Sequence, residues 1–244
     1  MTLHGAAVLV TGGTRGIGLA IARRFVRDGA GRVVLGYLRN DSAAEAAAGE
    51  IRAAGAEVDL VRGNVASEST IAKIAAAGPY RVIVHNAATG VVRPALETED
   101  KHWDWTLNAN ARSLLALARA TVPAMDAGSA IVAISSLGSH RVLDNYVLIG
   151  ASKAALESVV RYLGVELAPR GIRVNAVSAG VVETEALDWF PNKDEMLATV
   201  DRTPAGRLVE PDDVAAAVSF LCSGDAAMVC GQTLVVDGGF SLGA

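Results

Sequence analysis

Short apolar runs alternate with longer stretches of helical periodicity along almost the whole chain. The runs are rich in valine and isoleucine and lack strict alternation of apolar and polar residues, which is typical of strands buried on both faces of a parallel sheet. Such strands are predicted at residues 6–10, 32–35, 57–61, 81–85, 130–135, 173–177 and 233–236. Helical stretches between them cover residues 18–28, 42–54, 68–76, 99–125, 151–167 and 212–222. The alternation predicts an α/β fold, a doubly wound parallel sheet of about seven strands.

One long segment, residues 181–206, interrupts this alternation between a strand and the next helix. Long irregular segments inside compact domains are commonly lids or binding loops. This one contains five large apolar side chains, Leu187, Trp189, Phe190, Met196 and Leu197. They suit the burial of a methylene chain, at about 0.8 kcal/mol per CH₂, or they simply anchor the segment. No linker or repeat divides the chain, so we expect a single domain over residues 1–244 with a lid at about 181–206.

Composition narrows the class of protein. The chain has 244 residues, of which 51% are hydrophobic, so it suits one large α/β domain and is too apolar for a disordered protein. We find no signal peptide and no apolar run near the roughly 20 residues of a membrane span. Cys222 and Cys230 are too few for a disulfide framework or a zinc site. The net charge of −4 argues against a nucleic-acid partner. Taken together, these features lead us to expect a cytoplasmic protein that binds no metal, nucleic acid or membrane.

A glycine-rich turn follows the first predicted strand. Gly12, Gly16 and Gly18 lie in the segment Gly12-Gly-Thr-Arg-Gly-Ile-Gly18, at the start of the first helix. Glycines allow a tight turn and a close approach to a pyrophosphate, and the helix N-terminus offers free N–H groups. A purely structural turn is the alternative. The place of the motif after the first strand of an alternating fold favours dinucleotide binding.

The end of the second strand bears on the choice of dinucleotide. An NAD-binding site typically has a carboxylate about 20 residues after the glycines, which binds the ribose 2′-hydroxyl. Here the segment is Gly36-Tyr-Leu-Arg-Asn40, and the first acid is Asp41. Arg39, together with Arg15 in the glycine turn, would instead bind a 2′-phosphate through charge-assisted hydrogen bonds. Two ordinary surface arginines are the alternative. We predict NADPH as the cofactor.

The glycine spacing, Gly-x3-Gly-x-Gly, resembles that of the short-chain dehydrogenase/reductase family, whose fold is a Rossmann fold. The resemblance covers the whole chain, and further motifs carry it: Asn86-Ala-Ala88, Asn110, Ser136, Ser152-Lys153, Val174-Asn-Ala176 and Val236-Asp-Gly-Gly239. It implies the following cofactor-binding residues: Gly12, Thr14, Arg15, Gly16, Ile17, Gly18, Leu38, Arg39, Asn64, Val65, Asn86, Ala87, Ala88, Ile134, Tyr146, Lys153, Gly180, Val182 and Thr184.

The tyrosine departs from the usual pattern of this family. Most members have a tyrosine four residues before the lysine, but here Ile149 stands four before Lys153, and Tyr146 stands seven before it. On one helix both positions share the face of the lysine, and Tyr146 lies about one turn nearer the N-terminus. In conjugate reduction of an enoyl thioester, hydride reaches the β-carbon while charge develops on the carbonyl oxygen two bonds away. A displaced hydroxyl suits the geometry of enoyl reduction better than that of ketone reduction.

The same spacing is similar to that of enoyl-acyl-carrier-protein reductases, and among them the chain resembles the NADPH-dependent type III enzymes. The segments that match are residues 87–94, 102–106, 135–139, 144–147, 190–192 and 203–207. The resemblance implies that Tyr146 hydrogen-bonds the thioester carbonyl and that Lys153 binds the nicotinamide ribose. It implies that Asn110 holds the lysine through water, and Ser136 matches the catalytic serine of the family.

We therefore expect an NADPH-dependent enoyl-thioester reductase of fatty-acid or polyketide biosynthesis. Its acyl substrate would be carried by an acyl carrier protein. Members of the family pair such long helices between subunits, so the resemblance also implies a homotetramer. Two alternatives stay open, a ketoreductase and an NADP(H)-binding protein without redox activity. We expect structural roles for His85, His102 and His140. Trp103 and Trp105 alternate on a predicted helix, so at most one of them lines the site, and core packing is their expected role.

Overall fold

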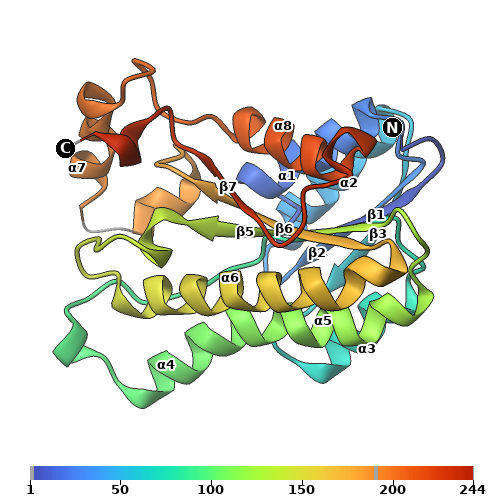
Figure 1. Cartoon of the computed structure of the whole chain (residues 1–244), viewed down its shortest axis with the longest axis horizontal. Coiled ribbons are helices and arrows are strands. Elements are labelled where there is room, and N and C mark those ends of the chain that lie inside the picture. The colour runs from blue at the N-terminus through green and yellow to red at the C-terminus, as the bar shows by residue number, and fades with distance from the viewer. Residues whose placement is uncertain (1–2, 190–191, 244) are drawn as a thin grey trace.

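A parallel sheet lies between two layers of helices in the computed structural model, which describes residues 3–189 and 192–243 (Figure 1). Within these ranges the strands are β1 (Ala7–Thr11), β2 (Arg32–Tyr37), β3 (Glu57–Arg62), β4 (Val82–His85), β5 (Ala130–Ser136), β6 (Arg173–Ala179) and β7 (Thr233–Val236). Their order across the sheet is β3-β2-β1-β4-β5-β6-β7, and every neighbouring pair is parallel. The predicted doubly wound fold is confirmed, and each predicted strand overlaps an observed one.

The two faces of the sheet bury separate halves of the core. Along β1, Val8 and Val10 belong to the cluster under α1 (Gly16–Arg27), α2 (Asp41–Ala53) and α8 (Pro211–Cys222), whereas Leu9 belongs to the opposite cluster. The opposite face is covered by α3 (Glu68–Ala76), α4 (Asp100–Leu107), α5 (Ser113–Thr121) and α6 (Val147–Leu167), as Figure 1 shows. Burial on both faces explains why the strands have continuous apolar runs.

The chain reverses its direction of travel across the sheet between β1 and β4. It moves outward from β1 to β3, then returns to place β4 on the other side of β1. The loops after β1 and β4 leave their strands at the same edge and turn to opposite faces, which opens a crevice between them. The glycine turn after β1 and the Asn86-Ala-Ala88 segment after β4 both lie at this edge.

Two helix predictions need correction. The predicted helix at 99–125 consists of α4, a π-helical turn at Asn108–Arg112, α5 and a 3-10 turn at Val122–Ala124. The helix predicted at 151–167 begins at Val147, so Gly150 lies inside α6. A Cβ on Gly150 would lie 2.6 Å from the carbonyl oxygen of Gly138, so this glycine permits a close approach of two backbones.

The segment predicted as a lid contains short helical pieces. These are a 3-10 turn at Glu185–Trp189, α7 (Lys193–Leu197) and a 3-10 turn at Ala198–Arg202. Of its predicted apolar side chains, Leu187 is buried and Phe190 lies outside the described residues. A parallel bridge between Val182 and Val209 brings the two ends of the segment together beside the carboxyl edge of the sheet. No helix within the described ranges is long and apolar enough to cross a membrane.

Candidate active site

The glycine turn has the backbone shape that a phosphate site needs. Gly12 and Gly16 have φ angles of 62° and 51°, in the left-handed region that favours glycine. A Cβ on Gly18 would overlap the carbonyl oxygen of Gly12, so only glycine permits the contact between α1 and the turn. No side chain caps the N-terminus of α1. Its first N–H groups are therefore available to an anion at the crevice.

Hydrogen bonds fasten the loop after β4 to the glycine turn. The Thr11 hydroxyl oxygen accepts from the backbone N–H groups of Asn86 and Ala87, both at 3.0 Å. The Asn86 side-chain amide donates to the backbone carbonyls of Thr11 and Gly12, also at 3.0 Å each. The predicted cofactor residues Asn86, Ala87 and Gly12 thus form one rigid unit, with Ala88 next to it on the surface. Thr11 is a contributor that the sequence analysis missed.

Asn110 joins this unit to α6. It is fully buried in the π-helical turn, and its side-chain amide exchanges two 2.8 Å hydrogen bonds with the backbone of Thr89. The same amide nitrogen donates to the Ser152 hydroxyl at 2.8 Å. π-Helical turns are rare and frequent at functional sites. The side chain of Asn110 therefore sets the distance between the β4 loop and the residue that precedes Lys153.

Lys153 points from α6 to the carboxyl end of β5. Its Nζ donates to the carbonyl oxygen of Ile134 at 2.7 Å, and the side chain is buried. Burial lowers the pKa of Lys153 to about 8, although Glu157 one turn along α6 opposes that shift. An ammonium has three donors, and one of them is used by Ile134. The others are suited to ligand hydroxyls in the crevice.

Tyr146 and Ser136 come together at the same edge. The Tyr146 hydroxyl donates to Oγ of Ser136 at 3.3 Å, and the ring lies on Gly138, where a Cβ would be 2.6 Å from two ring carbons. Contrary to the helical placement assumed from the sequence, Tyr146 is the residue before α6, and Asn145 before it has a left-handed φ of 58°. Burial raises the pKa of Tyr146, partly opposed by the hydrogen bond with Ser136, so its hydroxyl is protonated at neutral pH.

Ile149 occupies the position where most of the family has its tyrosine. It is 8% exposed, and a Cβ on Gly90 would overlap its side chain. An apolar side chain thus packs directly on the loop after β4. The hydroxyl that the structure offers at this end of α6 is that of Tyr146, about one turn further from Lys153.

Further predicted cofactor-binding residues follow β2 and β3, and Arg15 lies in the glycine turn. Leu38 and Arg39 are exposed, whereas Asp41 is engaged by the Tyr37 hydroxyl at 2.9 Å and by Arg62 at 3.2 Å. Arg15 forms an exposed 3.1 Å ion pair with Glu185. The side chain of Asn64 accepts from the backbone N–H of Ala66 and shapes the turn before α3, next to partly buried Val65.

The remaining predicted residues lie around the same crevice. Thr14 and Val182 are buried, and Ile17 packs against the core below α1. The backbone N–H of Gly180 donates to the carbonyl of Val236 at 2.9 Å. A Cβ on Gly16 would be 3.4 Å from the methyl group of Thr184, so the start of the predicted lid touches the glycine turn.

The other singled-out side chains lie elsewhere. His102 accepts from the backbone N–H of Glu99 at the start of α4, and His140 contacts Ser139, as expected for structural roles. Trp103 and Trp105 are 48% and 44% exposed, so the core packing predicted for them is wrong for the single chain. Among the described residues, no group of histidine, cysteine and carboxylate side chains is arranged to hold a metal ion.

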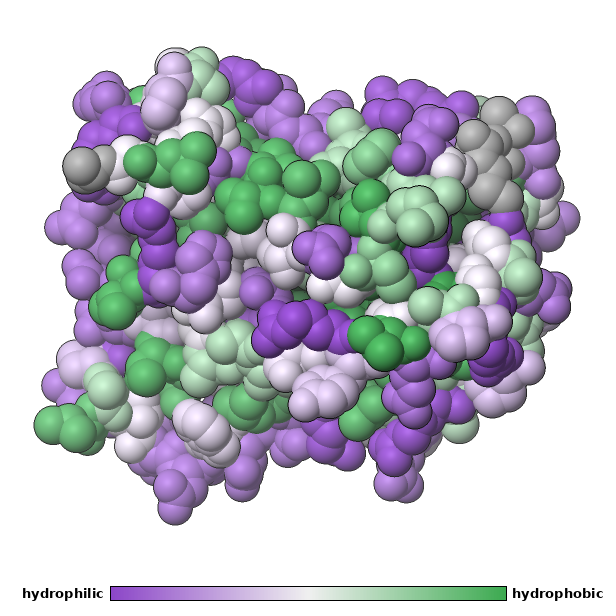
Figure 2. Space-filling model, viewed as in Figure 1, coloured by the Kyte–Doolittle hydropathy of each residue, from purple (hydrophilic) through white to green (hydrophobic). Residues whose placement is uncertain are grey.

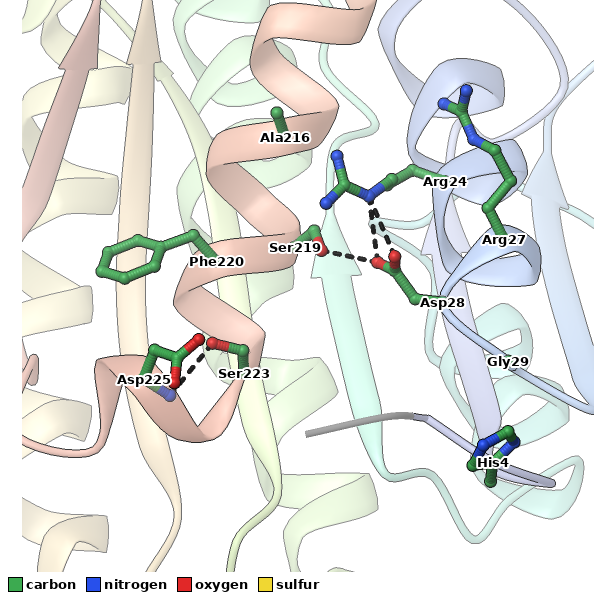
Figure 3. Close-up of a pocket in the computed structure, with 10 residues that line it drawn as sticks. All are labelled: His4, Arg24, Arg27, Asp28, Gly29, Ala216, Ser219, Phe220, Ser223 and Asp225. Carbon is green, nitrogen blue, oxygen red and sulfur yellow. Dashed lines mark hydrogen bonds and ion pairs between the residues drawn. The ribbon is translucent and has the colours of Figure 1, made fainter.

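A separate surface depression lies at the opposite edge of the sheet, between the C-terminal ends of α1 and α8 (Figure 3). Its charged side chains are largely satisfied by one another. Arg24 contacts both carboxylate oxygens of Asp28, at 3.0 and 3.1 Å, and the hydroxyl of Ser219 donates to the same carboxylate. It contains none of the predicted site residues.

Known proteins are similar to this chain over most of its length. The family model described as "Enoyl-(Acyl carrier protein) reductase" matches residues 12–241. A 1-cyclohexenylcarbonyl-CoA reductase of Streptomyces collinus is 37% identical over 96% of this chain and 86% of its own length. A galactitol 2-dehydrogenase of Cereibacter sphaeroides is 36% identical over 98% of this chain and 96% of its own.

Solved structures agree with the sequence matches. A short-chain dehydrogenase from Burkholderia cenocepacia, crystallised with NADP, superposes with a TM-score of 0.91 at 31% identity, covering 99% of this chain and 100% of that one. A blue fluorescent protein from a metagenomic library, crystallised with NADPH, gives 0.90 at 30% identity with the same coverage. The chain belongs to the short-chain dehydrogenase/reductase family, and it is an oxidoreductase by that membership.

Proposed function

We propose that the protein reduces the carbon–carbon double bond of an enoyl thioester with NADPH. The observation that carries this proposal is the hydroxyl of Tyr146, paired with Ser136 one helical turn beyond the position that Ile149 fills. The match to the enoyl reductase family model and the likeness to a cyclohexenylcarbonyl-CoA reductase support it.

The crevice fits a dinucleotide phosphate. The left-handed Gly12 and the Gly18 contact leave room for a pyrophosphate at the uncapped start of α1. Lys153 has donors to spare for the nicotinamide ribose, and Arg39 is exposed where a 2′-phosphate would lie. The structures crystallised with NADP and NADPH support the same choice. Bound there, the cofactor would supply the hydride, and the protein would orient and bind.

The side chains would divide the remaining work. The Tyr146 hydroxyl would donate a hydrogen bond to the thioester carbonyl oxygen and so stabilise the negative charge of the enolate. The positive charge of Lys153 would favour proton donation by the tyrosine, and Asn110 would keep α6 and the β4 loop at a fixed distance. In the unliganded protein the phenol donates its one proton to Oγ of Ser136 at 3.3 Å. With substrate bound, this proton would turn to the thioester carbonyl, and the Ser136 hydroxyl would orient the phenol by donating to the phenol oxygen.

A ketoreductase is the second candidate. The hydrogen-bonded pair of Ser136 and Tyr146 favours it, because a serine beside the phenol is suited to a ketone oxygen, and the galactitol 2-dehydrogenase relative acts on a sugar alcohol by its name. One assay distinguishes the two reactions. Oxidation of NADPH with crotonyl thioester but not acetoacetyl thioester is expected. The reverse pattern would establish the ketoreductase, and oxidation with neither would favour a protein without redox activity.

The carrier of the acyl chain is also a proposal. We expect an acyl carrier protein, and the coenzyme A thioester named for the Streptomyces relative is the alternative. Comparing kcat/KM for crotonyl groups on each carrier decides between them. In either case we propose that residues 181–206 act as a lid, because their first turn touches the glycine turn at Gly16 and Thr184.

A homotetramer would cover the apolar side chains that the single chain exposes. On α4 and α6 these include Trp103, Trp105, Tyr162 and Val165, the last two 76% and 79% exposed. Figure 2 shows further apolar side chains along the edge of the sheet near β7, which is an edge strand. Light scattering after size-exclusion chromatography is expected to give four times the 25.1 kDa chain mass.

Arg39→Ala is expected to reduce the preference for NADPH over NADH by about 10- to 100-fold in kcat/KM, because one charged hydrogen bond contributes about 1.5–3 kcal/mol. The loss should lie in the KM for NADPH, with NADH little changed. Arg27→Ala, an arginine at the opposite edge of the sheet (Figure 3), is the control and should leave the ratio unchanged. An unchanged ratio in Arg39→Ala would contradict the assignment of this residue.

NADPH binding is expected to weaken above about pH 8. Protonated Lys153 donates charge-assisted hydrogen bonds to the ribose, whereas the neutral amine donates only weakly, and the pKa of Lys153 in the unliganded protein is about 8. Above that pKa the protonated fraction falls tenfold per pH unit, and the dissociation constant should rise in proportion. Fluorescence titration between pH 6.5 and 9.5 measures it, with Lys153→Met as the control that should lack this dependence. A constant affinity up to pH 9.5 would refute the role.

A further inference from the structure

His85 is a fully buried histidine at the end of β4, directly before Asn86. Its Nε2 lies 2.7 Å from Oγ of Ser113, and the Ser113 hydroxyl donates to the backbone carbonyl of Ala109. Because the proton of Ser113 is committed to Ala109, its oxygen accepts from His85. The imidazole therefore carries its proton on Nε2, and its Nδ1 is a hydrogen-bond acceptor.

This Nδ1 has no hydrogen-bond partner among the described residues. A buried acceptor without a protein partner is costly, and internal water molecules commonly satisfy such atoms. Protonation does not solve the problem, because burial, with a contribution from the charge of Lys153, lowers the pKa of His85 to about 3. The atom is thus an acceptor at every ordinary pH.

Lys153 lies on the same side of the sheet. Alternation along β4 places His85 on the face of Ile83, which packs in the cluster that α6 covers. His85 is paired in register with Ala133 of β5, and Lys153 donates to the carbonyl of the next residue, Ile134. The ammonium of Lys153 therefore contacts β5 one residue beyond the position that is paired with His85 on β4.

We propose that His85 is a positioning residue for Lys153, its Nδ1 accepting a hydrogen bond from a buried water that in turn accepts one from Nζ of the lysine. The inference rests on the proposed function, in which Lys153 binds the nicotinamide ribose. With Ile134 and the water each taking one of its three donors, the third is left for the ribose. The bridge gives the ammonium a second acceptor, which favours its protonated state and fixes its direction. Glu157 on α6, held by the Ser135 hydroxyl, favours the same state from along the helix.

Two amide variants distinguish the roles of the two imidazole nitrogens of His85. In His85→Gln the longer side chain reaches the place of Nε2, so the contact with Ser113 is retained and the acceptor at Nδ1 is lost. In His85→Asn the shorter side chain reaches the place of Nδ1, so the acceptor is retained and the contact with Ser113 is lost. If the proposal is right, His85→Gln should bind NADPH more weakly than His85→Asn. If His85 has only a structural role through Ser113, the order of the two affinities should be the reverse.

The measurement is the NADPH dissociation constant at pH 6.5 and pH 8.5. His85→Gln is expected to match the wild type at pH 6.5 and to bind about threefold more weakly at pH 8.5, as follows from a lysine pKa about half a unit lower. His85→Asn is expected to follow the wild type at both pH values. An equal or larger loss in His85→Asn, or no loss in His85→Gln, overturns the proposal.

A crystal structure of the wild-type protein supplies a readout that does not depend on the variants folding. A water molecule within hydrogen-bond distance of both Nδ1 of His85 and Nζ of Lys153 is expected, and its absence from well-defined density overturns the proposal. A wild type that binds NADPH but reduces neither thioester would refute the proposed function and leave this comparison of the variants valid.

Discussion

Replacing Tyr146 with phenylalanine is expected to lower kcat for enoyl reduction by about 100- to 1,000-fold, the usual cost of removing one donor to a developing oxyanion. The ring that lies on Gly138 is unchanged by this substitution, so the fold and the packing before α6 should persist. NADPH affinity should change by less than about threefold, since Lys153 and the glycine turn keep their contacts. Steady-state kinetics with crotonyl thioester, together with a binding titration, measures both effects.

The chain offers a matched control for this variant. Tyr162 lies on the same helix, α6, with its side chain 76% exposed. Tyr162→Phe removes a phenol hydroxyl from a tyrosine outside the crevice and should leave kcat unchanged. Full activity in Tyr146→Phe would show that another group stabilises the enolate, and the assignment built on the Tyr146–Ser136 pair would have to be abandoned.

Gly18→Ala is expected to weaken NADPH binding by at least about 100-fold. The added methyl group would overlap the carbonyl oxygen of Gly12, which belongs to rigid backbone, so the first turn of α1 must move away. That movement takes the N–H groups of the helix out of line with the pyrophosphate. Losing two hydrogen bonds to a charged group, at about 1.5–3 kcal/mol each, gives this factor. Fluorescence titration with NADPH measures it, and circular dichroism checks that the variant is folded.

Gly49→Ala is the control for the effect of an added methyl group at Gly18. Gly49 is an exposed glycine inside α2, and no atom lies within 4 Å of the position of an added Cβ. Alanine is the better helix former by about 1 kcal/mol. This variant should therefore raise the free energy of unfolding by about that amount and leave NADPH affinity unchanged. A Gly18→Ala protein that bound NADPH like the wild type would show that the crevice tolerates the methyl group and does not hold the phosphates there.

Several members of the candidate site could be predicted because their signals are local. The glycine turn and Arg39 are recognisable from neighbours within a few residues and from their place after a strand, and Lys153 from the family motif Ser152-Lys153. Their expected contacts with a cofactor stay predictions. Thr11, Gly90 and Gly138 escaped prediction, because each matters through a residue far away in the sequence: Asn86, Ile149 and Tyr146. No pattern within a short window indicates such contacts.

By itself, the sequence determined the order of strands and helices along the chain, the parallel sheet and the glycine turn at the start of the first helix, since hydrophobic periodicity and glycine spacing are properties of consecutive residues. Only the tertiary structure decided where α6 begins, that Tyr146 precedes the helix with its hydroxyl on Ser136, and that the buried Nδ1 of His85 has no partner among the described residues. These features depend on contacts between strands, loops and helices that become neighbours when the sheet is assembled. Their energies are decided by packing and burial in three dimensions, which no stretch of sequence contains.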